Sequence, residues 1–327
     1  QKLSLTLPTW NTPYPKTPTI DCVLPALLVS SYWHQKSRSL VARGAGFKIY
    51  EISLIKGSVL VRCIPGPAEK VVVKKIVGYD DVLYFVGMNG RIWRGEINTE
   101  ILSSVVENDE ANDTEQSFNI KIDPEFTQAH ERLVSDARIH TTTTGNRFLV
   151  TLGWDFRAKV FAIEHTLLSL HAEIRFPVQG ACFTTASING EDLIVVGKLE
   201  STVLDVYDLD LQLQHRIALN DAEFNTSGFT PRSLSFHDGF LAVATSHLPY
   251  MRLIIVALQK MDPSVPIQRN QILRNISTVA PQDKFLQPIV TFRSSGAGVW
   301  IASDDGTLRG YDLQTGAVAV ELVLLHS

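Results

Sequence analysis

The chain has 327 residues, of which 45% are hydrophobic and 20% charged, and this composition is typical of a globular protein with one large or two small domains. It contains no run of about 18 apolar residues to span a bilayer and no signal-peptide core, so we expect an intracellular protein of the cytoplasm or nucleus without a membrane partner. The net charge of −4 makes direct binding of nucleic acid an unfavourable hypothesis.

The N-terminal part combines an alternating run with a proline-rich segment. Leu3–Leu7 alternates like a strand and can pair with one end of the fold, whereas residues 8–26 hold five prolines. Basic residues then gather between Lys36 and Lys75, where nine Lys or Arg accompany only two acids. They are either an ordinary solvated face or a basic sector for a partner.

The chain that follows repeats one pattern: an apolar run, a turn, and a second apolar run that ends near a polar residue. The pattern occurs six times, beginning at Ser39, Val82, Arg147, Asp192, Phe240 and Gly298. Alternation of period two dominates these runs, and no long window shows a helical period, which predicts an all-β chain.

Further strands are expected before and after these repeats. Inner strands are predicted at Val72–Val77, Ala137–Thr142, Ala181–Ala186, Ser233–Phe236 and Pro288–Phe292, and outer strands at Ser58–Cys63, Ile101–Val106, Leu167–Ile174, Gln212–Leu219 and Ala317–Leu324. Residues 107–131 carry eight acids and one lysine, and they are predicted to form an acidic insertion at a blade edge, either a solvated linker or a docking segment.

The repeats follow one another at intervals of roughly 43 to 65 residues, and periods in the forties are typical of four-stranded propeller blades. Blades stacked radially bury the faces that a single sheet would expose. The sequence therefore predicts that residues 1–327 form one β-propeller of four-stranded antiparallel blades.

Two repeats end in an aromatic–Asp pair, Tyr207-Asp208 and Tyr311-Asp312, and the second follows an Asp-Gly turn at Asp305-Gly306. They resemble the WD-repeat family, whose blades carry a Gly-His pair before the first strand, an Asp in a turn, and Trp-Asp after the third strand. The other four repeats lack the aromatic–Asp pair, and no Gly-His pair occurs in the chain. The chain therefore resembles a divergent member of the WD-repeat family. The resemblance implies seven blades as the preferred count, with six as the alternative.

The chain contains none of the local motifs that mark common catalytic or metal sites. Nucleophile elbows, phosphate-binding loops and zinc-protease motifs are absent, and the three cysteines and nine histidines show no ligand spacing. We therefore expect no catalytic residue, metal or cofactor. The resemblance implies a non-catalytic interaction scaffold in a multiprotein assembly; the alternative is a propeller hydrolase or isomerase with its site at the central funnel.

Two surfaces are predicted to bind proteins. The first is the rim formed by turns between the second and third strands, where Trp154, Phe156 and Arg157 are the best candidates. The other residues expected around this rim are Arg43, Asn89, Asp155, Lys198, His247, Tyr250 and Asp304. The second is the basic sector of the first two blades, where Arg43, Lys70, Lys74 and Lys75 are expected to dock an acidic segment of a partner.

Overall fold

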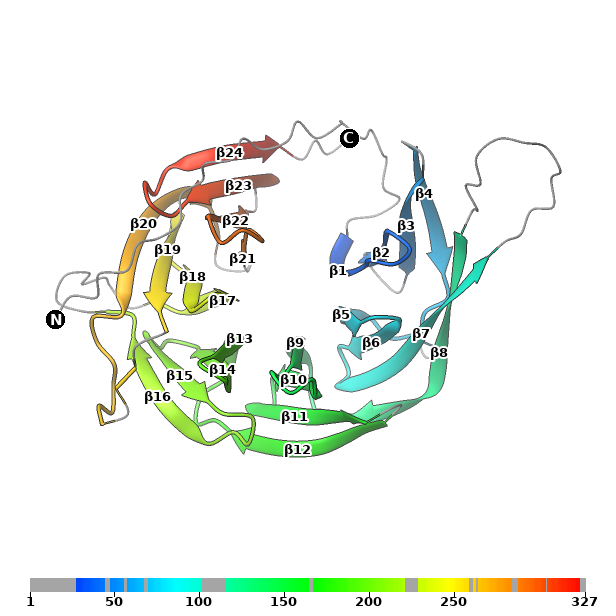
Figure 1. The fold of residues 1–327 in the computed structure, drawn as a ribbon, viewed down its shortest axis with the longest axis horizontal. Helices are drawn as coiled ribbons and strands as arrows, with labels where there is room; N and C mark the ends of the chain where they lie inside the picture. Colours follow the sequence, from blue (N-terminus) through cyan, green and yellow to red (C-terminus); the bar gives the residue numbers. More distant parts are fainter. Residues whose placement is uncertain are drawn as a thin grey trace.

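The structure is a computed structural model in which the chain forms six sheets side by side around an arc (Figure 1). Each sheet has four antiparallel strands in sequential order, which is one propeller blade. The described residues are 28–44, 48–55, 58–67, 70–101, 116–164, 167–220, 229–258, 261–262, 264–283, 288–303 and 305–323. The expected strand Leu3–Leu7 and the proline-rich segment 8–26 lie outside them.

The blades are numbered 1 to 6 in chain order. Blades 1 to 3 consist of β1 (Leu28–His34), β2 (Ser39–Gly44), β3 (Ile49–Ile55), β4 (Ser58–Ile64); β5 (Val73–Tyr79), β6 (Val82–Gly87), β7 (Arg91–Ile101), β8 (Gln116–Gln128); and β9 (Val134–Thr141), β10 (Arg147–Gly153), β11 (Arg157–Glu164), β12 (Leu167–Arg175).

Blades 4 to 6 repeat this arrangement. They consist of β13 (Gly180–Ile188), β14 (Glu191–Lys198), β15 (Val203–Tyr207), β16 (Leu213–Ala218); β17 (Pro231–His237), β18 (Phe240–Thr245), β19 (Tyr250–Ala257), β20 (Ile272–Pro281); and β21 (Ile289–Phe292), β22 (Gly298–Ala302), β23 (Thr307–Asp312), β24 (Val318–Val323). All six repeats found in the sequence are the second and third strands of a blade.

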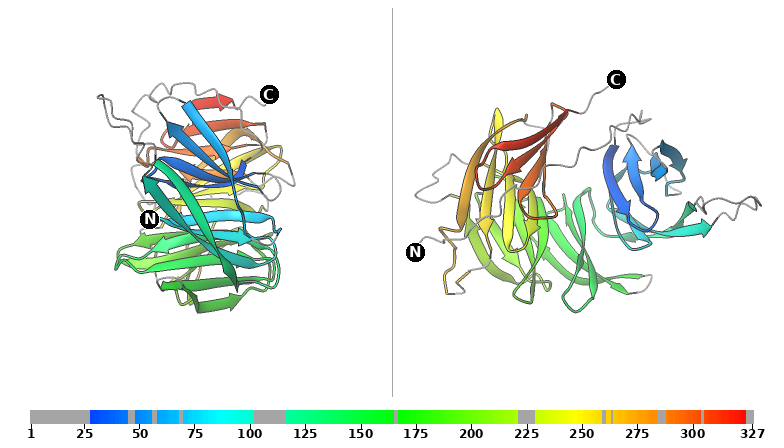
Figure 2. Two further views of the ribbon diagram at one scale, coloured as in Figure 1. Left: turned by 90° about the vertical axis from the view of Figure 1, so that its right-hand side faces the viewer. Right: turned by 45° about the horizontal axis from the view of Figure 1, so that its top comes forward.

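The number of blades differs from the preferred prediction. Within the described residues there are six blades, which is the alternative count, rather than seven. The described strands of blades 1 and 6 stand apart, so that Figures 1 and 2 show an open arc. The two longest intervals between repeats, from Val82 to Arg147 and from Phe240 to Gly298, contain the extended β7–β8 pair and the connection from β19 to β20.

The apolar core lies between neighbouring blades. Val150 and Val160 of blade 3, for example, share a cluster with Phe183 and Ile194 of blade 4, and all four side chains are buried. Similar clusters join the other neighbouring pairs. Removal of these faces from water is the main driving force for stacking the sheets.

Serine hydroxyls connect inner strands that do not pair with each other. The backbone N–H of Ile76 in β5 donates to Ser30 Oγ in β1 at 2.9 Å, and Phe292 N–H in β21 donates to Ser235 Oγ in β17 at 3.1 Å. The edge of each inner strand would otherwise present unsatisfied polar groups toward the centre.

The sequence prediction for the outer part of blade 2 was wrong. The fourth strand is β8, Gln116–Gln128, and not Ile101–Val106. Most of the expected acidic insertion 107–131 is therefore strand, while residues 102–115 lie outside the described part. The physical reason is that Phe118, Ile120 and Ile122 alternate among the acids, and Ile120 packs against the buried cluster shared with Trp93.

The two aromatic–Asp pairs have structural roles. Tyr311 is buried between blades 5 and 6, and its hydroxyl accepts a hydrogen bond from Val279 N–H at 3.1 Å. Asp312 Oδ1 accepts hydrogen bonds from the backbone and the hydroxyl of Thr315, at 2.7 and 2.8 Å, and so closes the turn before β24. The pair anchors the third strand and shapes the turn that follows.

Candidate protein-interaction site

The turn between β10 and β11 carries the most prominent of the predicted binding residues. Trp154 lies at its tip and is 51% exposed, so it is not packed inside its own blade. Its backbone N–H donates to the carbonyl of Leu133 at 2.8 Å, which fixes the backbone while leaving the indole largely in water. A large aromatic side chain on a restrained backbone is a common feature of binding surfaces.

A buried histidine and aspartate hold this turn in place. His130 lies in the connection before β9, and its Nδ1 is 2.9 Å from Asp155 Oδ1, while its Nε2 is 2.8 Å from Thr151 Oγ1. The other Asp155 oxygen accepts Glu131 N–H at 3.2 Å. Burial, only partly opposed by Asp155, lowers the pKa of His130, so the neutral ring donates to Asp155 and accepts from Thr151.

The rest of the turn depends on the same network. A Cβ at Gly153 would lie 2.3 Å from His130 Nδ1 and 2.5 Å from Asp155 Oδ1, so no larger residue fits without displacing them. Phe156 has a positive φ of 66°, and its carbonyl accepts a hydrogen bond from Phe176 N–H at 2.7 Å. These constraints leave the Trp154 turn with one backbone conformation.

Arg157 is held at the base of the turn by an ion pair with Glu173 of β12. Lys159 Nζ lies 3.0 Å from the same carboxylate. Burial alone would raise the pKa of Glu173, but hydrogen bonds from Lys159 and Arg157 lower it below its ordinary value. Arg157 is thus a partly buried support for the turn, and of the three predicted residues only Trp154 is prominently exposed.

His130 was not predicted as a functional residue, because alanine rather than glycine precedes it. Its place shortly before β9 resembles that of the histidine in the WD-repeat pattern. A usable signal was present: a histidine shortly before a predicted inner strand, followed by an Asp in the next hairpin turn.

Other residues predicted for the rim occupy equivalent positions in neighbouring blades. Because strand order repeats, turns between second and third strands lie on one face of the arc, which we call the turn face. Tyr250 and Leu248 are exposed beside β19, and Met88 is exposed in the β6–β7 turn next to Asn89. Lys198 pairs instead with Asp205 at 2.5 Å, and His247 with Thr245 at 2.7 Å; Asp304 lies outside the described residues.

The predicted basic sector is not one continuous surface. Arg43 is buried, and burial lowers the pKa of its guanidinium, so it was wrongly placed at the surface. Lys75 lies on the inner strand β5, where its side chain is 29% exposed and forms an ion pair with Asp136 of β9. Lys74 is on the same strand, and Lys70 is exposed in the connection before it.

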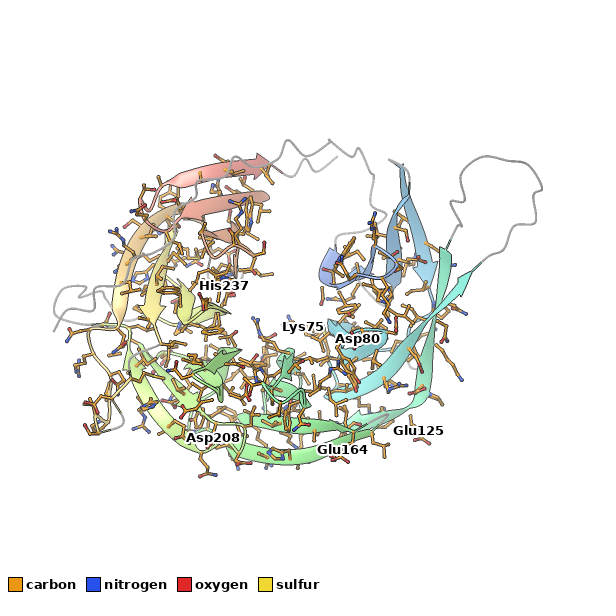
Figure 3. All side chains as sticks on the ribbon, in the orientation of Figure 1. Lys75, Asp80, Glu125, Glu164, Asp208 and His237 are labelled. Atoms are coloured by element: carbon orange, nitrogen blue, oxygen red, sulfur yellow. The ribbon has the colours of Figure 1, made fainter. Side chains whose placement is uncertain are left out.

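Charged side chains occur on two neighbouring inner strands, with Lys75 on β5 and Asp136 and Arg138 on β9. Figure 3 shows Lys75 at the inner edge of the arc. Arg138 of β9 donates to the carbonyl of Leu234 in β17 at 3.1 Å, although blade 4 separates these two strands in the sequence. In the described part of the chain, no group of three or more His, Cys, Asp or Glu is arranged to hold a metal ion.

Within the described part of the chain, no helix has the length and apolar character needed to cross a membrane.

Comparison with solved structures supports the propeller architecture. The WD40 β-propeller domain of Doa1 matches with a TM-score of 0.60 and 10% identity, covering 92% of this chain and 83% of that one. Sqt1 of Saccharomyces cerevisiae matches with a TM-score of 0.58 and 12% identity, covering 90% of this chain and 73% of that one. Identities this low show similarity of fold alone.

One curated relative and one family match at the level of sequence. The "Uncharacterized protein YGR117C" of Saccharomyces cerevisiae is 29% identical over an alignment of 224 residues. The match covers 57% of this chain. The match spans 47% of that protein, so the chain corresponds to about half of the relative's length. Residues 1–323 match the family described as "UCP007778, beta-propeller domain", and the chain therefore belongs to this family of β-propeller domains.

Proposed function

We propose that this β-propeller is a non-catalytic interaction scaffold, a subunit that holds other proteins in a larger assembly. The observation that carries the proposal is the turn of blade 3, where a buried His130–Asp155 hydrogen bond fixes the backbone beneath the exposed indole of Trp154. The geometry serves binding without a chemical step, because the polar groups are satisfied within the turn and the apolar group faces outward.

The restrained backbone of the Trp154 turn lowers the entropic cost of binding a partner. An exposed Trp on a mobile loop would lose conformational freedom on binding, which opposes association. Here the backbone is already restrained by Leu133, His130 and Phe176, so that burial of the indole in a partner contributes with little ordering cost.

The turn face offers further apolar contacts to the same partner. Tyr250 and Leu248 of blade 5 are 54% and 51% exposed, and Met88 extends the set to blade 2. Large exposed side chains at equivalent turns suit a partner that spans several blades rather than a small molecule held in one pocket. In this proposal Trp154 is the main anchor and Tyr250 a supporting contact.

We also propose a contact with an acidic segment of a protein partner, in a smaller form than the sequence suggested. Lys70 is exposed and Lys74 partly exposed near the start of β5, so these two lysines can meet carboxylates. Lys75 belongs to an ion pair with Asp136, and Arg43 is buried; neither is part of the proposed contact.

The test compares two exposed side chains in the full chain. Trp154→Ala removes the proposed anchor, and Leu213→Ala removes an apolar group of similar exposure from the outer strand of blade 4. Both variants are purified from the native cell with their bound proteins, and the proteins recovered are quantified by mass spectrometry. The partners whose recovery falls are then produced and their affinities measured directly.

The expected result is a set of proteins lost with Trp154→Ala and kept with Leu213→Ala, with affinity for at least one of them reduced ten-fold or more. The melting temperatures of the two variants should match. Equal recovery of every bound protein with the two variants would contradict the proposal.

A further inference from the structure

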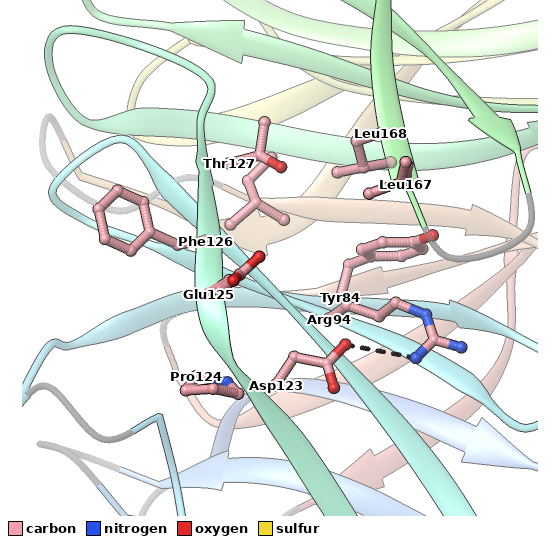
Figure 4. Close-up of a pocket in the computed structure, with 10 residues that line it drawn as sticks. Tyr84, Arg94, Asp123, Pro124, Glu125, Phe126, Thr127, Leu167 and Leu168 are labelled. Carbon is pink, nitrogen blue, oxygen red and sulfur yellow. Dashed lines mark hydrogen bonds and ion pairs between the residues drawn. The ribbon is translucent and has the colours of Figure 1, made fainter.

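A pocket of about 440 Å³ lies at the outer rim, between the outer strands of blades 2 and 3 (Figure 4). Its wall on one side is β8, with Asp123, Glu125 and Phe126, and on the other side is the start of β12, with Leu167. Tyr84 and Arg94, from the second and third strands of blade 2, form its floor. Its size is within the range of small-ligand pockets and is sufficient for one or two side chains with their backbone.

The floor of the pocket carries polar atoms that are not satisfied within the described structure. Tyr84 is fully buried, and neither its hydroxyl nor Arg94 Nε has a hydrogen bond of normal geometry among the described residues. Burial, followed by the charge of Tyr79 and a hydrogen-bonding interaction with it, raises the pKa of Tyr84. Because water reaches neither atom, a ligand does not contact them directly, and they form a closed base beneath the outer part of the pocket.

The guanidinium of Arg94 is held in place by ion pairs with two carboxylates of blade 2. Its Nη1 lies 3.3 Å from Asp123 Oδ2, and its Nη2 lies 3.6 Å from Glu96 Oε2. These ion pairs hold the guanidinium and neutralise its positive charge. Arg94 and Arg91 stand against Asp123, Glu96 and Glu125, so the local balance is still negative, which disfavours a phosphate or carboxylate ligand and favours a cation.

The mouth of the pocket is apolar and partly rigid. Leu167 is 71% exposed and Phe126 is 41% exposed, on opposite sides of the opening. The guanidinium carbon of Arg91 lies 4.0 Å from the centroid of the Phe126 ring, which keeps the ring in position. Two large apolar side chains facing each other across an opening bind an aliphatic group between them.

We propose that this pocket binds an extended segment of a partner protein in which an aliphatic residue precedes an Arg or Lys. The aliphatic side chain inserts between Phe126 and Leu167, and the cationic side chain contacts Glu125. The site adds a second contact to the proposed scaffold function, on which its biological role rests, and it lies apart from the Trp154 turn in sequence and in lining residues.

The test uses short peptides, so it does not depend on the identity of the natural partner. The probe is the acetylated and amidated peptide Ala-Ala-Leu-Arg-Ala-Ala, titrated into the full chain carrying ¹³C-labelled Ile and Leu methyl groups. The comparison peptides replace Arg by Glu, or Leu by Ser. Binding is followed by the methyl resonances of Ile92, Leu167 and Leu168, which line the pocket.

We expect saturable shifts of these methyl resonances with the Leu-Arg peptide, and an affinity at least ten-fold lower for each comparison peptide. Glu125→Gln should weaken binding and reduce its dependence on salt, whereas Glu191→Gln, an exposed carboxylate of blade 4, should have no effect. Tyr84→Phe should leave binding unchanged, because the hydroxyl that it removes is closed off from water and so from the peptide.

Two results would overturn the inference. One is the absence of methyl shifts at millimolar concentrations of the Leu-Arg peptide; the other is equal binding of the Arg and Glu peptides. The Trp154→Ala variant should bind the probe like the wild type, so failure of the turn-face proposal and failure of the pocket proposal can be told apart.

Discussion

His130 Nδ1 lies 2.9 Å from Asp155 Oδ1, and this buried contact joins the connection before blade 3 to the turn that presents Trp154. The two residues are distant in sequence but share one role, because the carboxylate also accepts backbone N–H groups of Glu131 and Arg157. The rigidity of the proposed binding turn therefore depends on a contact inside the blade.

The first prediction concerns the energetic weight of this contact. Asp155→Ala leaves the His130 ring and two backbone N–H groups without their acceptor, so the free energy of unfolding should fall by about 2–3 kcal/mol. The matched control is Asp210→Ala, which breaks the exposed pair of His171 Nε2 and Asp210 Oδ1 at 2.9 Å and should change stability by less than about 0.5 kcal/mol. Chemical denaturation measures both; equal losses would show that the buried contact has no special role.

The second prediction concerns pH. Burial lowers the pKa of His130 in the folded chain, whereas in the unfolded chain it titrates near its ordinary value of about 6.5. The unfolded state thus binds more protons below that pH, so the contribution of His130 to stability is present above pH ~6.5 and is lost as the pH falls toward the folded pKa.

His130→Asn removes this proton uptake. Below about pH 6 the free energy of unfolding of the wild type should fall more steeply than that of the variant, by up to about 1.4 kcal/mol per pH unit. Urea titrations of the two proteins at several pH values give the difference. Parallel slopes would mean that His130 is protonated equally in the folded and unfolded states.

The third prediction separates two lysines that the sequence grouped together. Lys75→Glu places a carboxylate beside Asp136, so it should destabilise the fold by about 2–3 kcal/mol, less than for a fully buried pair because both side chains are partly exposed. Lys70→Glu, on an exposed connection, should change stability by less than about 0.5 kcal/mol but lower the affinity for an acidic partner. Thermal melts of both variants measure the stability changes. A Lys75→Glu protein as stable as the wild type would contradict the structural role of Lys75 and return it to the proposed contact with an acidic partner.

The sequence was sufficient to predict the blades because the hairpin of each blade carries its own local signal. The strands around Tyr207 and Tyr311 combine alternation with a polar turn, and both features are readable without tertiary information. β8 was missed because the five acids of residues 107–115 dominated the composition of the segment, although Ile120 is buried. Composition averages over both faces of a strand, whereas burial concerns one face.

The candidate sites were less predictable because they depend on contacts between blades. Trp154 was found from its residue type and its place in a turn, but the direction of Lys75 depends on Asp136 in the next blade. The rim pocket brings Tyr84 and Leu167 together from different blades, and neither has a local motif. Only the relative placement of the sheets reveals such sites.

The most direct test of the central claim is site-specific photo-crosslinking at Trp154 in the native cell. A photoreactive phenylalanine analogue replaces Trp154 in one protein and Leu213 in a control, and the crosslinked products are identified after irradiation. If the blade 3 turn binds a protein, we expect discrete protein adducts from position 154 that are absent from position 213. No adduct at position 154, or the same adducts from both positions, would contradict the claim that the blade 3 turn is a protein-binding anchor.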